Sequence, residues 1–119
     1  MEMNKNIENS KAQMRKGTLE FAILLIISKG DVYAGDIIDR LKDADLLVVE
    51  GTLYPLLSRL KTEKLLEYSW QESPTGPPRK YYSLTPLGKD MIRALHESFN
   101  SLTNSLHSLI KEYEKNNQH

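Results

Sequence analysis

The side chains of this chain that could recognise a partner by charge and hydrogen bonding gather on a helix predicted from Glu50–Leu60 (EGTLYPLLSRL). Thr52 is a candidate N-cap, because its hydroxyl can accept a hydrogen bond from a free backbone N–H of the first turn. Pro55 then lies in the first turn, where its missing N–H is not needed. The helix is expected to end near Lys64, and winding it at about 100° per residue puts its leucines on one face.

The opposite face of this helix combines small residues with hydrogen-bonding and cationic ones. Small residues let a helix backbone approach base edges, and rim cations and tyrosines can hold phosphates. The pattern predicts a helix that enters the major groove of DNA, although an ordinary amphipathic helix with a solvated face has the same spacing. The candidate DNA contacts on this helix are Thr52, Tyr54, Ser58, Arg59, Lys61 and Thr62.

A cationic hairpin is predicted directly after this helix. Leu65–Gln71 alternates like a strand, Ser73–Pro78 is rich in proline and is expected to be an irregular turn, and Lys80–Leu84 returns as a strand. Arg79 and Lys80, at the base of the tip, are candidate phosphate contacts. The layout is typical of a winged helix, whose wing follows the DNA backbone or the minor groove. A structural hairpin with solvated charges is the alternative.

Two helices are predicted before the recognition helix and would complete a helix-turn-helix. The first is a buried helix from about Ser10 to Ser28, preceded by a polar, frayed Met1–Asn9. The second runs from about Val32 to Asp43, with Asp31 as its cap.

Tyr33 lies near the start of the second helix. Its hydroxyl is a candidate phosphate contact, and a half-buried ring at the edge of the core is the alternative.

A long last helix is predicted to open at Thr85-Pro86, with Thr as cap and Pro in the first turn, and to continue to about Glu114. Its length of about 45 Å exceeds what a compact domain with a radius of gyration of about 13–14 Å can cover. Its apolar residues recur in alternating steps of three and four, the spacing of a coiled-coil seam, which predicts a homodimer. The tail Lys115–His119 is expected to be disordered. The seam residues are Ile92, Leu95, Phe99, Leu102, Leu106, Leu109 and Tyr113.

The composition limits the functional classes to which the chain can belong. Sixteen basic and sixteen acidic residues give no net charge, which argues mildly against a nucleic-acid binder, although only the contacting face must be positive. The absence of cysteine excludes disulfides and thiolate metal sites and fits a cytoplasmic protein. The longest apolar run, Phe21–Ile27, is too short to span a bilayer, so no membrane association is expected.

No catalytic or metal-binding pattern is present. His96 and His107 share the last helix but lie about 16 Å apart along its axis, too far to chelate one metal within a chain. There is no phosphate-binding glycine loop and no nucleophile–base signature. We therefore expect no enzyme activity, no catalytic residue and no cofactor.

The chain resembles the PadR-like family of transcriptional regulators. The resemblance is carried, in order along the chain, by RKGTLEFAILLIISKG, VYAGDIIDRLK, EGTLYPLLSRLK and GPPRKYYSLTPLG, and by the long helix that follows. Gly35 and Pro77 depart from the pattern, since many relatives carry an aromatic residue and an arginine there. The resemblance implies a mainly α fold with a small β-hairpin: a winged helix-turn-helix domain over residues 10–84 and a dimerisation helix over residues 85–115.

The resulting hypothesis is a repressor that binds an inverted-repeat operator as a homodimer. The resemblance implies release by a small molecule or a stress signal. Phe99 in the seam could stack a small aromatic effector between the dimer halves, and a plain core aromatic is the alternative. A winged-helix dimer that binds other proteins and no DNA is the alternative function.

Overall fold

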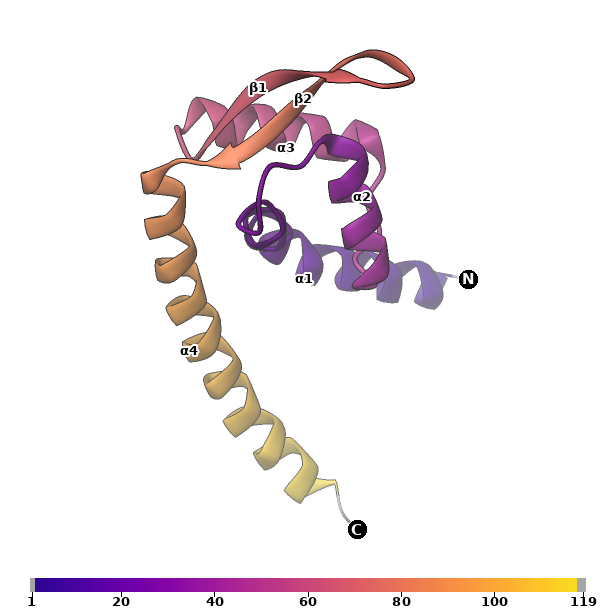
Figure 1. Ribbon diagram of the computed structural model, residues 1–119. Helices are drawn as coiled ribbons and strands as arrows, with labels where there is room; N and C mark the ends of the chain where they lie inside the picture. The colour runs from indigo at the N-terminus through magenta and orange to yellow at the C-terminus, as the bar shows by residue number, and fades with distance from the viewer. Residues whose placement is uncertain (1, 118–119) are drawn as a thin grey trace.

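The computed structural model describes residues 2–117 as four helices and one hairpin (Figure 1). Three helices and the hairpin form a winged helix-turn-helix, and the fourth helix extends away from it, which confirms the predicted fold class. The elements are α1 (Glu2–Ile27), α2 (Ala34–Asp43), α3 (Glu50–Thr62), β1 (Leu66–Ser73), β2 (Gly76–Leu84) and α4 (Pro86–Asn116).

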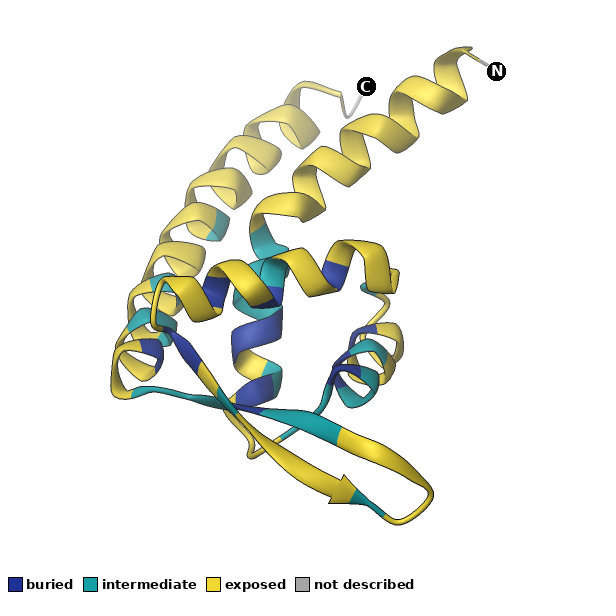
Figure 2. Ribbon diagram, turned by 90° about the horizontal axis from the view of Figure 1, so that it is seen from above, coloured by how far each residue is buried: buried dark blue, intermediate teal, exposed yellow. Residues whose placement is uncertain are grey.

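The hydrophobic core lies where α1, α2 and α3 meet the foot of the hairpin (Figure 2). Each helix contributes apolar residues at steps of three or four, so one stripe of each faces inward. Burying each such side chain stabilises the fold by about 1.5–3 kcal/mol. The fully buried residues are Ile23, Leu24, Ile27, Ile37, Leu41, Leu53, Leu57 and Leu60.

The ends of α2 and α3 share one type of C-terminal turn. The Leu46 N–H donates to the Leu41 carbonyl at 2.7 Å, and the Leu65 N–H donates to the Leu60 carbonyl at 3.0 Å. The residue directly before each of these leucines has a positive φ value: 61° for Asp45 and 64° for Lys64. These are Schellman motifs, in which a left-handed residue lets the chain turn back and places a leucine against the end of its own helix.

The helix starts differ from the sequence prediction. α1 begins at Glu2 rather than near Ser10, so Glu2–Asn9 is helical, although it is exposed. α2 begins at Ala34 with Tyr33 as its N-cap. Asp31 does not cap it, because Val32 forms an antiparallel bridge with Tyr82. The backbone N–H and carbonyl of Val32 both form hydrogen bonds to Tyr82.

α3 also begins earlier than predicted, at Glu50, with Val49 as the N-cap residue. Thr52 is therefore not the cap, and Pro55 lies inside the helix. The cause is the extended backbone of Val49, with φ −92° and ψ 159°, which lets its carbonyl accept the first helical hydrogen bonds. Pro55 removes one hydrogen bond, the one that would reach the Gly51 carbonyl.

The hairpin is longer than predicted. β1 and β2 pair antiparallel from Leu66↔Leu84 to Ser73↔Gly76, with an irregularity between Gln71 and Ser73. Pro77 and Pro78 belong to β2 rather than to an irregular turn. Both prolines fit because they lie opposite the irregularity in a two-stranded sheet, where no ladder N–H is required of them.

α4 leaves the domain as a projecting helix (Figure 1). The Thr85 hydroxyl caps it by accepting from the Gly88 N–H at 3.0 Å, as predicted. The chain measures 62 × 37 × 22 Å with a radius of gyration of 17.8 Å, larger than that of a compact domain. The helix continues beyond Glu114 to Asn116, and Gln118 and His119 of the predicted disordered tail lie outside the described residues, as does Met1.

None of the helices within residues 2–117 combines the length and the hydropathy that a membrane crossing requires.

Candidate nucleic-acid interface

The outer face of α3 is small and exposed. Ser58 and Thr62 lie opposite the buried leucines, and Gly51 and Pro55 continue the same surface toward the start of the helix. The Thr62 hydroxyl donates to the Ser58 carbonyl at 2.9 Å, so it is held against its own helix. This narrow surface can lie against base edges without a large side chain in between.

Two cations, one from α3 and one from β2, lie over aromatic rings of the hairpin. Lys61 Nζ lies 5.1 Å from the centroid of the Tyr68 ring, and Lys80 Nζ lies 4.5 Å from the same ring and 5.5 Å from that of Trp70. A ring attracts a cation without neutralising its charge. The two ammonium groups are therefore positioned and still available to an anion.

Arg79 of β2 also lies over an aromatic ring, that of Tyr33 at the start of α2. Its guanidinium carbon lies 4.4 Å from the centroid of the Tyr33 ring, which also contacts Tyr81 at 5.7 Å between centroids. Tyr33 is half-buried, so the ring covers the edge of the core as well as Arg79.

Gly35 makes room for the Tyr33 ring. A Cβ added at Gly35 would come within 2.6 Å of Tyr33 Cε2, so the ring lies directly over the glycine. The departure from the family pattern at Gly35 is thus covered in this chain by the Tyr33 ring.

Part of this surface lines an open hollow of about 490 Å³ between the start of α2, the outer side of α3 and the hairpin. Glu50 is the acidic residue that lines it, and its negative charge partly offsets the positive charges of Arg79 and Lys80 in the same lining. Tyr33, Gly35, Tyr54, Ser58, Trp70 and Arg79 also line it.

The opposite side of α3 is occupied by ion pairs. Arg59 pairs with Glu20 of α1 and lies 4.0 Å from Glu63. The sequence predicts that Arg59 can hold a phosphate, but in this structure the carboxylates of Glu20 and Glu63 offset its charge. Thr52 lies on this same side and is exposed.

Trp70 is a surface feature that the sequence prediction did not assign. It is 62% exposed on β1 and pairs in register with Lys80. The signal was present in the sequence, because strand alternation puts Tyr68 and Trp70 on one face of the hairpin.

Tyr82 anchors this surface to the core. Burial raises the pKa of its hydroxyl above the ordinary value of 10.0, and the neighbouring Tyr54 and Tyr68 raise it further. Tyr82 therefore remains protonated and uncharged over the physiological pH range.

The predicted seam of α4 divides into two parts. Ile92 and Leu95 pack against the core of their own chain, and Phe99 contacts Phe21 of α1 with ring centroids 6.1 Å apart. Phe99 is 41% exposed. The remaining seam residues Leu102, Leu106, Leu109 and Tyr113 are exposed in the single chain.

Comparison with known proteins points to one family. Residues 23–94 match the model of the transcriptional regulator PadR-like family. The chain is 52% identical to a PadR-like transcription factor of Bacteroides fragilis, covering 85% of this chain and 98% of that one with a TM-score of 0.72.

Two further solved structures agree. A PadR-like transcriptional regulator of Bacillus cereus is 37% identical over 82% of this chain and 96% of its own, with a TM-score of 0.74. A PadR family transcriptional regulator of Eggerthella lenta is 26% identical over 92% of this chain and 96% of its own, with a TM-score of 0.85.

Proposed function

This chain belongs to the PadR-like family of transcriptional regulators, and on that basis we propose that it is a repressor that binds an inverted-repeat operator as a homodimer. Members of the family are DNA-binding regulators and not enzymes. Repression requires access to the chromosome, so the proposed site of action is the cytoplasm.

The observation that carries this proposal is the row of cations held on aromatic rings beside the outer face of α3. Lys61, Lys80 and Arg79 each rest on a ring, next to the small surface at Ser58 and Thr62. We propose that α3 enters the major groove and that the hairpin cations hold the flanking phosphates. Net neutrality of the whole chain then limits non-specific binding.

The DNA contacts we propose are Tyr33, Tyr54, Ser58, Lys61, Thr62, Arg79 and Lys80. Thr52 stays a proposed contact at the edge of the helix. Arg59 is a weaker candidate, because a phosphate would have to compete with Glu20 for its guanidinium.

The exposed part of α4 supports the homodimer. Leu102, Leu106 and Leu109 are 55%, 46% and 59% exposed, and they repeat at coiled-coil spacing along a helix that projects from its own domain. A second copy of α4 is the simplest cover for such a stripe. A closed two-fold dimer presents two recognition helices and so implies a two-fold site.

The test is selection of duplex DNA from a random pool by the full-length protein, followed by footprinting of the selected duplex. We expect two protected half-sites whose centres are separated by about one helical turn or a small multiple of it. Protection of a single half-site would contradict the two-fold arrangement. Failure to select any sequence would favour the protein-interaction module instead.

Effector release remains part of the proposed function. Phe99 is the sequence candidate for stacking an aromatic effector, but the hollow that it lines with Phe21 in a single chain is only about 110 Å³.

A further inference from the structure

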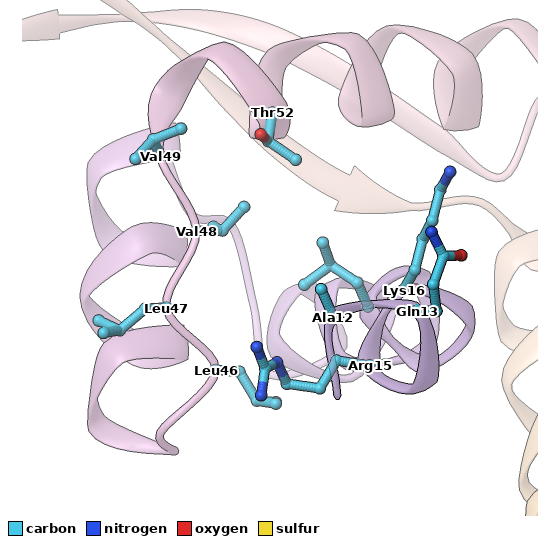
Figure 3. A pocket seen from close by; sticks show the side chains of 10 residues that line it. Ala12, Gln13, Arg15, Lys16, Leu46, Leu47, Val48, Val49 and Thr52 are labelled. Carbon is cyan, nitrogen blue, oxygen red and sulfur yellow. The ribbon is translucent and has the colours of Figure 1, made fainter. Parts of the chain in front are cut away.

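A hollow of about 620 Å³, which we call the α1 hollow, lies between the middle of α1 and the connection from α2 to α3 (Figure 3). Its wall is mainly aliphatic: Leu19 from α1 and Leu46–Val49 from the connection. Leu47 and Val49 are 78% and 71% exposed. Scattered exposed leucines are ordinary, but a concave group of them with a few polar residues has the form of a ligand site.

Two adjacent cations of α1 border this aliphatic wall. Arg15 extends across the hollow on the side of Leu46, whereas Lys16 points toward α3 (Figure 3). Within residues 2–117 neither side chain forms an ion pair with a carboxylate. Among the described residues that line the hollow, none is acidic and none is aromatic.

We propose that the α1 hollow binds an aliphatic monocarboxylate, with its carboxylate at Arg15 and its hydrocarbon chain along Leu46–Val49. The unpaired guanidinium selects an anion, and it suits a carboxylate in particular because it can bind both oxygens. The lining offers no ring on which a flat molecule could stack, so an alkyl chain fits it better than an aromatic one.

This ligand would act on the recognition helix. Val49 is the N-cap residue of α3 and Thr52 lies in its first turn, and both line the hollow. The bound carboxylate would neutralise one positive charge close to the start of the DNA-facing helix, which lowers DNA affinity. This regulatory step rests on the proposed function, whereas binding of the carboxylate does not.

Calorimetric titration of the full-length protein tests the site without DNA. Sodium decanoate below its micelle concentration should bind saturably, and decyltrimethylammonium, which has the same tail and the opposite charge, should not. Octanoate should bind at least about tenfold more weakly, because each buried methylene contributes roughly fourfold. Equal affinity for the two head groups, or no dependence on tail length, would overturn the proposal.

Variants locate the site. Arg15→Ala should weaken decanoate binding about tenfold or more, as expected when charge-assisted hydrogen bonds are removed. Lys111→Ala removes the same charge from the far end of α4 and should leave binding unchanged. Leu47→Ser, at an exposed position, should also weaken it. If Leu47→Ser instead disrupts the dimer in sedimentation and leaves decanoate binding intact, the hollow is an interface between copies and the proposal is wrong.

The regulatory step is tested on the selected operator. Saturating decanoate should raise the apparent Kd of the wild-type protein and should have little effect on the Arg15→Ala variant. An unchanged Kd would refute the regulatory step. If the wild-type protein binds no DNA, the proposed function fails, and the titrations still decide whether the α1 hollow is a carboxylate site.

Discussion

At the scale of single residues, the candidate interface depends on rings that position cations. Tyr33 contacts Arg79, and Tyr68 contacts both Lys61 and Lys80. Each ring reduces the freedom of a long side chain before any partner arrives, so less conformational entropy is given up on binding.

Replacing both hairpin cations should weaken DNA binding without changing sequence preference. In the Arg79→Ala, Lys80→Ala variant, affinity for operator and for random duplex should fall nearly alike. The log–log slope of affinity against salt should become shallower by about one for each phosphate that the variant no longer binds. Ser58→Ala is the contrasting variant and should change base preference with little change in slope. Normal binding by the double variant would show that the two hairpin cations do not hold DNA phosphates.

A methyl group at Gly35 should disturb the Tyr33–Arg79 pair. The added carbon of Gly35→Ala would collide with the Tyr33 ring, so the ring must move and Arg79 loses its support. We expect operator affinity to fall roughly two- to thirtyfold, the range of a cation–π contact, as measured by fluorescence anisotropy. Gly17→Ala is the matched control, because its added carbon meets nothing within 4 Å. Equal affinities for the two variants would mean that Tyr33 does not position Arg79.

At the scale of elements, the turns at the ends of α2 and α3 use non-glycine residues in the left-handed region. Lys64 has φ 64°, where a side chain is strained and glycine is not. Lys64→Gly should therefore raise the free energy of unfolding by about 1 kcal/mol. Lys61→Gly, inside α3, should lower it by about 1 kcal/mol. Chemical denaturation of the two variants measures both, and a decrease in stability in each would show that Lys64 is not strained.

Thr85 joins two elements through one hydroxyl. It accepts from the Gly88 N–H and donates to the Lys64 carbonyl at 2.6 Å, so it connects the end of α3 to the start of α4. Thr85→Ala should cost about 1–2 kcal/mol of unfolding free energy, as measured by chemical denaturation. Thr85→Ser keeps the hydroxyl and should cost much less. Similar decreases in the two variants would assign the effect to the methyl group instead.

The interiors of the elements were predictable from the sequence, and their ends and cross-contacts were less so. Helical spacing in the core stripes and the Thr85-Pro86 start are local signals, which is why the four helices and the hairpin were identified. The start of α2 depends instead on Val32 pairing with Tyr82, far away along the chain, and no local pattern encodes that bridge.

The candidate site shows the same division. The sequence placed Ser58 and Thr62 on the outer face of the recognition helix, because that placement needs only the period of a helix. It could not show that Glu20 neutralises Arg59 or that Tyr33 covers Gly35. Both contacts depend on how separate segments pack.

At the scale of the whole molecule, the proposed dimer depends on the exposed half of α4. Leu102→Asp should abolish dimerisation, because two buried leucines, each contributing about 1.5–3 kcal/mol, would be replaced by two carboxylates in an apolar seam. A nanomolar dimer constant should rise by roughly three decades or more. The protomer should stay folded, since Leu102 is 55% exposed in the single chain.

Sedimentation and a gel shift on the same variant decide between the outcomes. Operator affinity should fall sharply with dimerisation, while Asn104→Asp, which adds the same charge away from the seam, should leave both unchanged. A Leu102→Asp protein that remains dimeric would place the interface elsewhere, most simply on α1. A monomer that still binds tightly would remove the need for two-fold recognition.

In the proposed dimer the projecting α4 would act as a lever. Its fulcrum is tight: Gly88 is buried, and any side chain there would collide with the Leu65 carbonyl at the foot of the hairpin. With an arm of about 46 Å, a tilt of about 10° at this fulcrum displaces the far end by about 8 Å. In the proposed dimer the C-terminal ends of the two α4 helices would be fixed to each other. The same tilt would then move the two winged helix-turn-helix domains instead. Small changes in packing around Leu65 and Gly88 would thus be magnified into a mismatch with the spacing of the half-sites.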